Sequence, residues 1–219
     1  MKLRLRFSKH GMMRYIGHLD IMRYFQKAMR RAEIPIKYSE GFSPHKIMSF
    51  SAPLGLGLES DAEYVDIVLT EETADPEDIM RRLNAVMCPG IAILNAVRIS
   101  DTAKKSMAVV ESAEYDVFWP DGTDREQLRA AAEALMNRDM IPEERPSGKT
   151  GELKTRNIRP LIYRLEVRED RLHMHVAQGS TDNLKPDVVL RALGLENIGF
   201  SINRTEVYGP DGVPLDRLL

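Results

Sequence analysis

The apolar residues of this chain change their spacing in the same order twice. A spacing of two residues is typical of a strand with one buried face, and a spacing near 3.6 residues is typical of an amphipathic helix. In the first half, these spacings predict strands at residues 2–7, 46–51, 62–69 and 91–99 and helices at residues 18–32 and 75–87. The order is strand, helix, strand, strand, helix, strand.

The second half repeats this order more loosely. We expect strands at residues 113–119, 161–168, 171–177 and 198–208 and helices at residues 124–137 and 185–193. Residues 139–159 are polar and contain Pro and Gly, which predicts a mobile loop. Two copies of a split βαβ unit predict an α+β protein with two tandem ferredoxin-like (βαββαβ) domains. Their expected bounds are residues 1–103 and 104–219, joined near Ser100–Met107.

The composition excludes several classes of protein. A single cysteine, Cys88, rules out an intramolecular disulfide, a self-sufficient iron–sulfur cluster and a thiolate zinc site. No apolar run approaches the roughly 18 residues that a membrane span needs. The alternating start Met1–Arg6 predicts a strand and not a signal peptide. We therefore expect a cytoplasmic protein with no membrane contact, no metal and no cofactor.

The charges are unevenly distributed along the chain. The whole protein has a net charge of −2, but residues 1–50 hold eleven Lys and Arg against three Asp and Glu. A basic first quarter on an acidic chain indicates a localised anionic partner. The alternative is that these charges form an ordinary solvated helix face.

RNA is the anionic partner that the first quarter suits best. Arg23, Lys27 and Arg30 share one face of the predicted helix, where they suit phosphate contacts. Aromatic residues are interleaved with the bases and suit stacking on unpaired nucleobases, although any one of them is more often part of a core. The predicted RNA-binding residues are Arg14, Arg23, Lys27, Arg30, Arg31, Lys46 and Phe42.

A second group of residues suits acid–base chemistry. His18 and Asp20 lie at the start of the first helix, and Glu40 and His45 lie in the loop that precedes the second strand. We expect the four to converge at one end of the sheet, where imidazole beside carboxylate serves as a general acid or base or holds a metal. The structural alternative is that Asp20 stabilises the helix start and that His18 orders a loop.

Two other patterns carry weaker signals. His173 and His175 are expected on one face of a strand, but a pair without a third ligand is a poor metal site. The glycines Gly55 and Gly57 superficially resemble a dinucleotide-binding loop. They lie between two predicted strands and lack the third glycine, so we reject that interpretation.

Three stretches together resemble a known family. They are Arg14-Tyr15-Ile16-Gly17-His18-Leu19-Asp20-Ile21-Met22-Arg23, Ser39-Glu40-Gly41-Phe42-Ser43-Pro44-His45-Lys46 and Pro53-Leu54-Gly55-Leu56-Gly57-Leu58-Glu59-Ser60. With Arg30-Arg31-Ala32 and Ile158-Arg159-Pro160-Leu161-Ile162, they resemble the radical-SAM-linked family of unknown function. That family occurs as a free-standing protein and as the C-terminal part of larger radical-SAM proteins. This chain departs from it at Gly17, where Ser is usual, and at Asn157, where an acid is usual. The resemblance implies association with a separate radical-SAM enzyme and with RNA modification, and it implies no reaction.

Three functional hypotheses follow. The first is a non-catalytic accessory module that binds RNA (tRNA or rRNA), or an RNA-bound partner, and acts with a separate radical-SAM enzyme. The second is an enzyme that acts on RNA through His18, Asp20 and His45. The third is a protein-interaction subunit without nucleic acid. The basic first quarter favours the first two hypotheses, and the overall acidity favours the third.

Overall fold

The computed structural model describes residues 1–146, 152–195 and 199–218. In the first half, the elements are β1 (Lys2–Lys9), α1 (His18–Arg31), β2 (Met48–Phe50), β3 (Glu59–Val68), α2 (Pro76–Asn84) and β4 (Ile91–Ile99). The second half contains α3 (Ser106–Val109), β5 (Ser112–Phe118), α4 (Arg125–Met136), β6 (Pro142–Pro146), β7 (Leu153–Asn157), β8 (Ile162–Val167), β9 (Arg171–Ala177), α5 (Pro186–Ala192) and β10 (Ser201–Tyr208). The predicted strands and long helices are confirmed within a few residues, except that the predicted start of the last strand includes residue 198, outside the described ranges.

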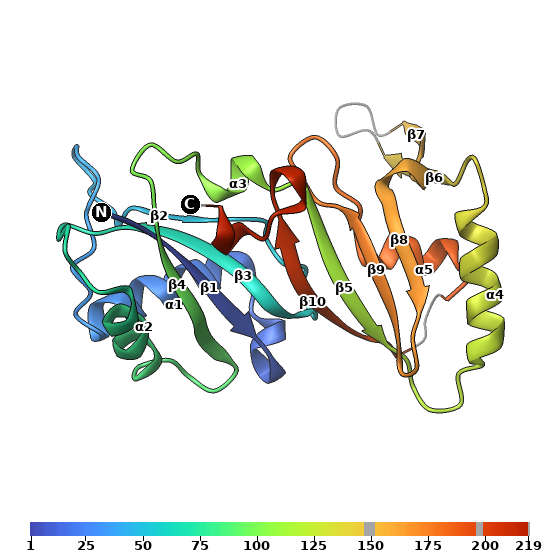
Figure 1. Ribbon diagram of the computed structural model, residues 1–219, viewed down its shortest axis with the longest axis horizontal. Helices are drawn as coiled ribbons and strands as arrows, with labels where there is room; N and C mark the ends of the chain where they lie inside the picture. The colour runs from blue at the N-terminus through green and yellow to red at the C-terminus, as the bar shows by residue number, and fades with distance from the viewer. Residues whose placement is uncertain (147–151, 196–198, 219) are drawn as a thin grey trace.

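One mixed sheet runs through both halves (Figure 1). Its order is β4-β1-β3-β10-β5-β9-β8, with β2 also paired to β3. When only the strands of this sheet are counted, each half has the order fourth, first, third, second. The halves meet where β10 pairs parallel to β3, with Asn203 opposite Glu59 and Arg204 opposite Ser60. The two tandem ferredoxin-like domains are therefore not confirmed as separate units. The protein is a mixed α+β protein with one large sheet.

The first-half helices α1 and α2 cover one face of β1, β3 and β4. Leu3, Leu5 and Phe7 alternate along β1 and pack with Phe25 of α1 and Leu83 of α2 in one core. All five side chains are at most 1% exposed. Period-two alternation in the strand and period-3.6 spacing in the helices thus place both apolar faces against each other.

The second-half strands carry a second core, which also includes Ala62 and Tyr64 of β3. Val117 of β5 and Met174 of β9 pack with Leu135 of α4 and with Val189 and Leu190 of α5. Figure 1 shows α4 and α5 beside these strands, away from α1 and α2. None of the helices in the described part of the chain is long and apolar enough to span a membrane.

A buried ion pair joins the two halves at the β3–β10 contact. Arg204 of β10 is fully buried, and its Nε lies 3.1 Å from the Glu63 Oε1 of β3. The Arg204 Nη2 also contacts Glu63 and donates to the Ala52 carbonyl oxygen at 2.9 Å. Burial opposes the charge on Arg204, but Glu63 and Tyr115 together outweigh burial and raise the pKa of the guanidinium.

The second buried ion pair lies on the other face of the sheet. The Arg4 Nε of β1 lies 2.7 Å from the Asp66 Oδ1 of β3, and both side chains are 2% exposed. Arg4 also donates to the Leu215 carbonyl oxygen at 2.8 Å, and Asp66 accepts from the Ser106 backbone N–H at 2.9 Å. Arg4 and Asp66 thus tie the C-terminal segment and the start of α3 to the first-half strands.

Residues 139–159 were predicted to form a loop, and this prediction is wrong in the part that the structure describes. Strands β6 and β7 pair there as a separate two-stranded sheet, with Glu143 opposite Arg156. These two side chains form an ion pair at 2.6 Å. The Asn157 side chain accepts from the backbone N–H groups of Ile141 and Arg159. Polar cross-strand contacts hold this hairpin, so apolar alternation gave no signal for it. Residues 147–151 of the predicted loop lie outside the described ranges.

We expect the Arg204–Glu63 pair to be strongly coupled in unfolding experiments. Glu63→Ala leaves the buried guanidinium without its carboxylate and should lower the free energy of unfolding by about 3–5 kcal/mol. The double variant Glu63→Leu/Arg204→Met should recover most of that loss, because it removes both charges. Urea denaturation at neutral pH measures both values. A double variant as unstable as Glu63→Ala would contradict this account.

Candidate functional site

Three basic side chains form a solvent-exposed row on α1. Arg23, Lys27 and Arg30, here called the basic face of α1, are all exposed, which confirms the predicted exposure. Arg23 pairs with Asp20 at 3.2 Å on the same helix. Neither Lys27 nor Arg30 forms an ion pair with any residue that the structure describes. An exposed i, i+3 pair contributes little stability, so all three cations remain available to an anion.

Two other predicted RNA-binding residues make local contacts. The Arg14 Nη2 donates to the Tyr15 hydroxyl at 2.8 Å, and the Arg14 Nη1 lies 3.7 Å from Glu59. Arg31 donates to the Val86 carbonyl oxygen at 3.0 Å, close to the end of α2. These contacts hold Arg14 and Arg31 to the protein surface, so neither is as free as the basic face of α1.

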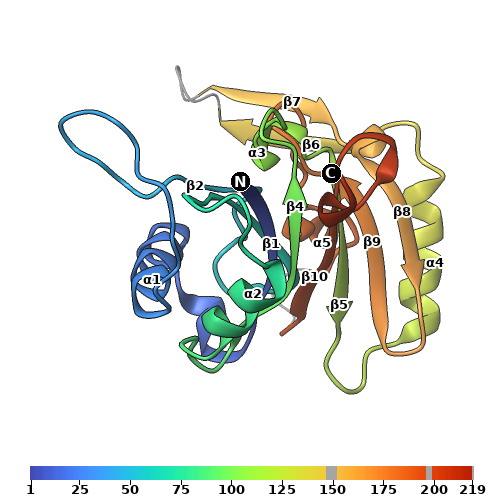
Figure 2. The same cartoon turned by 60° about the vertical axis from the view of Figure 1, so that its left-hand side comes forward.

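A loop projects from the protein after α1 (Figure 2). Residues 38–46, here called the 38–46 loop, begin and end at the bridge between Tyr38 and Lys46. The Ser39 Oγ accepts from the His45 backbone N–H at 3.1 Å and lies 2.9 Å from the His45 Nδ1. His45 therefore closes the neck of this loop and has a structural contact there.

The 38–46 loop presents aromatic side chains to solvent. Phe42 has a relative exposure of 111%, and Tyr38 is 49% exposed. The Lys46 ammonium lies 5.1 Å from the centre of the Tyr38 ring, within cation–π range. Burial of Phe42 in a core, which was the structural alternative, is wrong. The exposed Phe42 ring suits stacking on a nucleobase.

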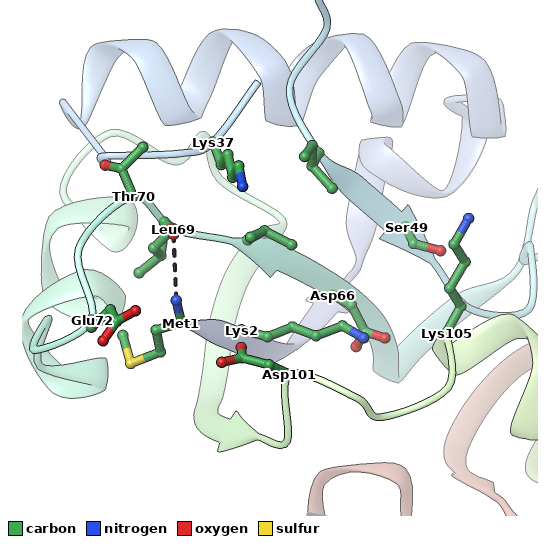
Figure 3. A pocket seen from close by; sticks show the side chains of 12 residues that line it. Met1, Lys2, Lys37, Ser49, Asp66, Leu69, Thr70, Glu72, Asp101 and Lys105 are labelled. Atoms are coloured by element: carbon green, nitrogen blue, oxygen red, sulfur yellow. Dashed lines mark hydrogen bonds between the residues drawn. The ribbon is translucent and has the colours of Figure 1, made fainter. Parts of the chain in front are cut away.

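A cavity of about 580 Å³ adjoins the base of the same loop (Figure 3). Lys2, Lys37 and Lys105 reach it from three separate segments of the chain. Lys2 donates to the Ala103 carbonyl oxygen at 2.6 Å. Of the three lining carboxylates, Asp66 is neutralised by Arg4, while Glu72 and Asp101 reduce the positive charge of the lysines. The cavity extends the basic surface only weakly.

His18 lies at the opposite end of the sheet from the 38–46 loop. Its ring centre is 5.7 Å from that of Phe50, and Lys9 and Glu63 border the same narrow cavity. The 38–46 loop follows the bridge of Ile36 with Leu69, beyond the β1 end where Lys2 pairs with Val68. The acid–base site predicted from His18, Asp20, Glu40 and His45 is therefore not assembled.

The length of α1 explains this error. The helix begins just after the end of β1, and its 14 residues carry the chain about 21 Å back to the other end of the sheet. Asp20 is exposed in the first turn and pairs with Arg23, and Glu40 is exposed in the 38–46 loop. The prediction was wrong because it placed the start of α1 and the 38–46 loop at the same end of the sheet.

The charged residues around His18 were not predicted from the sequence. Lys9 is 3% exposed, and its ammonium donates to the Ile16 carbonyl oxygen at 2.8 Å. Lys9 continues the inward series of β1, as Glu63 continues that of β3. A charged residue at an inward position of a strand was the available signal. The cavity measures only about 20 Å³, which is room for no more than about one water molecule. We assign it a structural role.

Two of the three quoted stretches meet beside this cavity. The Gly57 N–H donates to the Arg14 carbonyl oxygen at 2.9 Å, and the Arg14 Nη1 lies 3.7 Å from the Glu59 Oε1. The remaining stretch forms the 38–46 loop at the other end of the sheet. The three quoted stretches therefore lie on two separate surfaces of the protein.

His173 and His175 lie on the sheet face opposite to α4 and α5. The His173 Nδ1 is 2.8 Å from Asp116, and the His175 Nε2 is 2.8 Å from the Ser112 hydroxyl. These partners belong to β5, so the histidines hold β9 to its neighbour. The described residues contain no group of three or more His, Cys, Asp and Glu side chains suited to a metal ion.

The fold is that of a mixed α+β protein. The amino-acid sequence identifies the family. Residues 2–186 match the family described as "Uncharacterized protein conserved in bacteria (DUF2344)", and the chain belongs to that family. No protein with a curated description matches.

Solved structures show only distant likeness. A chain of a Cbf5-Nop10-Gar1 complex has a TM-score of 0.47 and 9% identity over 94% of this chain. This protein spans 48% of that chain. An unknown protein from Galdieria sulphuraria has a TM-score of 0.30 and 15% identity, covering 93% of this chain and 96% of its own. A heavy metal efflux pump has a TM-score of 0.28 and 10% identity, covering 93% of this chain and 28% of its own.

We expect the surroundings of His18 to make stability depend on pH. Burial lowers the pKa of His18, Glu63 opposes this and Lys9 adds to it. The folded protein therefore binds this proton more weakly than the unfolded chain, whose histidines titrate near about 6.5. The free energy of unfolding should fall as the pH drops below about 6.5 and level off below the folded pKa.

His18→Phe keeps a ring against Phe50 and removes this titration. Urea denaturation between neutral and mildly acidic pH should show a smaller loss of stability than in the wild type. Burial also lowers the pKa of His175, so the double variant with His175→Phe should show a smaller loss still. Equal pH dependence in the wild type and both variants would refute the assignment.

Proposed function

We propose that the protein is a non-catalytic accessory module that binds RNA, such as tRNA or rRNA, or an RNA-bound partner. The observation that carries the proposal is the basic face of α1, which leads into a projecting loop with an exposed aromatic ring. Arg23, Lys27 and Arg30 contribute the phosphate contacts, and Phe42 and Lys46 contribute the contacts to an unpaired nucleotide. Phosphate contacts supply affinity without reading sequence, and stacking favours single-stranded segments.

The separation of His18 from His45 favours binding over catalysis. A general acid and base must reach the same substrate atoms within hydrogen-bond distance. The hypothesis of an RNA-acting enzyme needed these residues in one pocket, and they lie at opposite ends of the sheet. The accessory role needs no such pocket.

We further propose that the module acts with a separate radical-SAM enzyme in the cytoplasm. The support is the sequence resemblance of the three quoted stretches. Exposed apolar side chains near two of these stretches suit a protein contact: Met12 is 80% exposed, and Leu19 and Leu56 are each 67% exposed. We also propose that each half derives from one split βαβ unit, because the strand order within each half is the same.

The basic face of α1 can be tested by the salt dependence of RNA binding. Replacing Arg23, Lys27 and Arg30 with Ala removes three phosphate contacts, so the log–log slope of affinity against salt should flatten by about two to three units. Stability should change by no more than about half a kcal/mol, because the three side chains are exposed. Filter binding or fluorescence anisotropy at several salt concentrations measures the slope.

A matched control removes three exposed bases elsewhere. Arg125, Arg129 and Arg138 lie on α4 or just after it, at the far end of the protein (Figure 1). Their replacement with Ala changes the net charge equally and should leave the slope close to that of the wild type. Equal slopes in the wild type and the α1 variant would refute the interface. A wild type that binds no RNA would leave the protein-interaction role in the lead.

Phe42 provides an independent test of stacking. Phe42→Ala should weaken binding to single-stranded RNA by about 1–3 kcal/mol and leave duplex binding unchanged, since only unpaired bases can stack on the ring. Phe42→Trp should retain the affinity. Leu94→Ala is the control, because Leu94 is an exposed apolar residue on β4. Equal losses for single strands and duplexes would show that Phe42 does not stack on a base.

A further inference from the structure

The leucines of residues 53–58 form one wall of a third cavity, which the proposed RNA interface does not use. The cavity measures about 580 Å³ and lies between this segment and α5. Leu54, Leu56 and Leu58 line it from the first half of the chain. A cavity of this size, with an apolar wall and a few polar groups, has the properties of a small-ligand site.

The wall from the second half carries the polar groups. The Tyr115 hydroxyl donates to the Gln178 Oε1 at 2.6 Å, which orients that amide. The side-chain amide of Asn183 and the ammonium of Lys185 also line the cavity, and neither has a partner among the residues that the structure describes. Asp187 also lines the cavity and lies 3.4 Å from Arg191, so the rim carries the Lys185 ammonium and a carboxylate that is paired on its own helix.

This combination selects a particular class of ligand. The Lys185 ammonium suits a phosphate, and the leucines suit the face of a planar ring. The Asn183 amide both donates and accepts hydrogen bonds, as does the edge of a nucleobase. A simple carboxylate would use the lysine and leave the apolar wall of leucines without a ligand contact.

We propose that this cavity binds a single nucleotide, with its base against the leucines and Asn183 and its phosphate at Lys185. The inference rests on the proposed function in one respect, which is that an unpaired nucleotide of the bound RNA supplies this ligand. Pro53 and Leu54 also line the narrow cavity that His18 borders at the start of α1. The nucleotide cavity therefore lies near the start of α1, which is the end of the helix closer in sequence to Arg23 than to Arg30.

The test titrates the intact protein with the four nucleoside 5′-monophosphates and follows backbone amide shifts by NMR. Ribose 5-phosphate is the probe without a base. At least one monophosphate should shift signals of residues 53–58 and 183–187 and bind at least fivefold more tightly than ribose 5-phosphate. Equal binding of ribose 5-phosphate, or no shifts in these segments at millimolar concentration, would overturn the proposal.

Three variants separate the parts of the site. Asn183→Ala should weaken binding of the monophosphate about fivefold and leave ribose 5-phosphate unchanged, because it removes only the contact to the base. Lys185→Ala should weaken both probes. Leu56→Trp should block the monophosphate, and its thermal unfolding shows whether the fold is kept. Lys104→Ala is an exposed-lysine control and should bind like the wild type. An Asn183→Ala variant that binds the monophosphate as tightly as the wild type would refute the assigned base contact.

The source of the nucleotide is tested with RNA. Leu56→Trp should weaken binding of a hairpin with an unpaired loop and leave a blunt duplex unchanged. If monophosphates bind in the cavity but no RNA binds, the proposed RNA function fails and the nucleotide site stands with a free nucleotide as its ligand. If Leu56→Trp weakens capture of a partner protein and no monophosphate binds, the cavity is a protein contact and the nucleotide proposal is wrong.

Discussion

The ion pair between Arg204 and Glu63 holds the two halves of the protein in one sheet. The parallel contact between β3 and β10 is short, with two residue pairs in register. A contact of that length would be weak by itself. The buried guanidinium bridges it, because it bonds both the Glu63 carboxylate and the Ala52 carbonyl oxygen. The segment that follows Ala52 is thereby held between the halves, where its leucines form a wall of the nucleotide cavity.

The same contact fixes which faces of the halves are continuous. Glu63 lies in register with the inward residues of β3, and Arg204 lies opposite the buried Tyr115 of β5. Because these two side chains meet, the helix-covered face of the first half continues into that of the second. On the opposite face, Arg6 of β1 pairs with Glu206 of β10 at 3.0 Å. The junction therefore has an ion pair on each face, and Ala62 and Tyr64 of β3 also pack into the second-half core.

Local spacing predicted most of the helices and strands, and contacts between distant segments account for the errors. The inward series Leu3, Leu5 and Phe7 was sufficient to predict β1 and its buried face. No local pattern indicates that Glu59 lies beside Asn203, so the shared sheet was missed. At the candidate site, helical spacing placed Arg23, Lys27 and Arg30 on one exposed face. The separation of His18 from His45 depends on the direction of α1 across the sheet, which spacing alone does not give.

Residues 1–50 contain more basic side chains than a partner can reach. Arg4 and Lys9 are buried, and Arg6 pairs with Glu206, so these three bases belong to the interior of the sheet and its junction. The exposed basic side chains of residues 1–50 are concentrated on α1 and around the 38–46 loop. Long-range attraction of RNA is therefore modest on a chain with a net charge of −2, and short-range contacts have to supply the affinity. An exposed ring and a nucleotide-sized cavity are the features that would supply them.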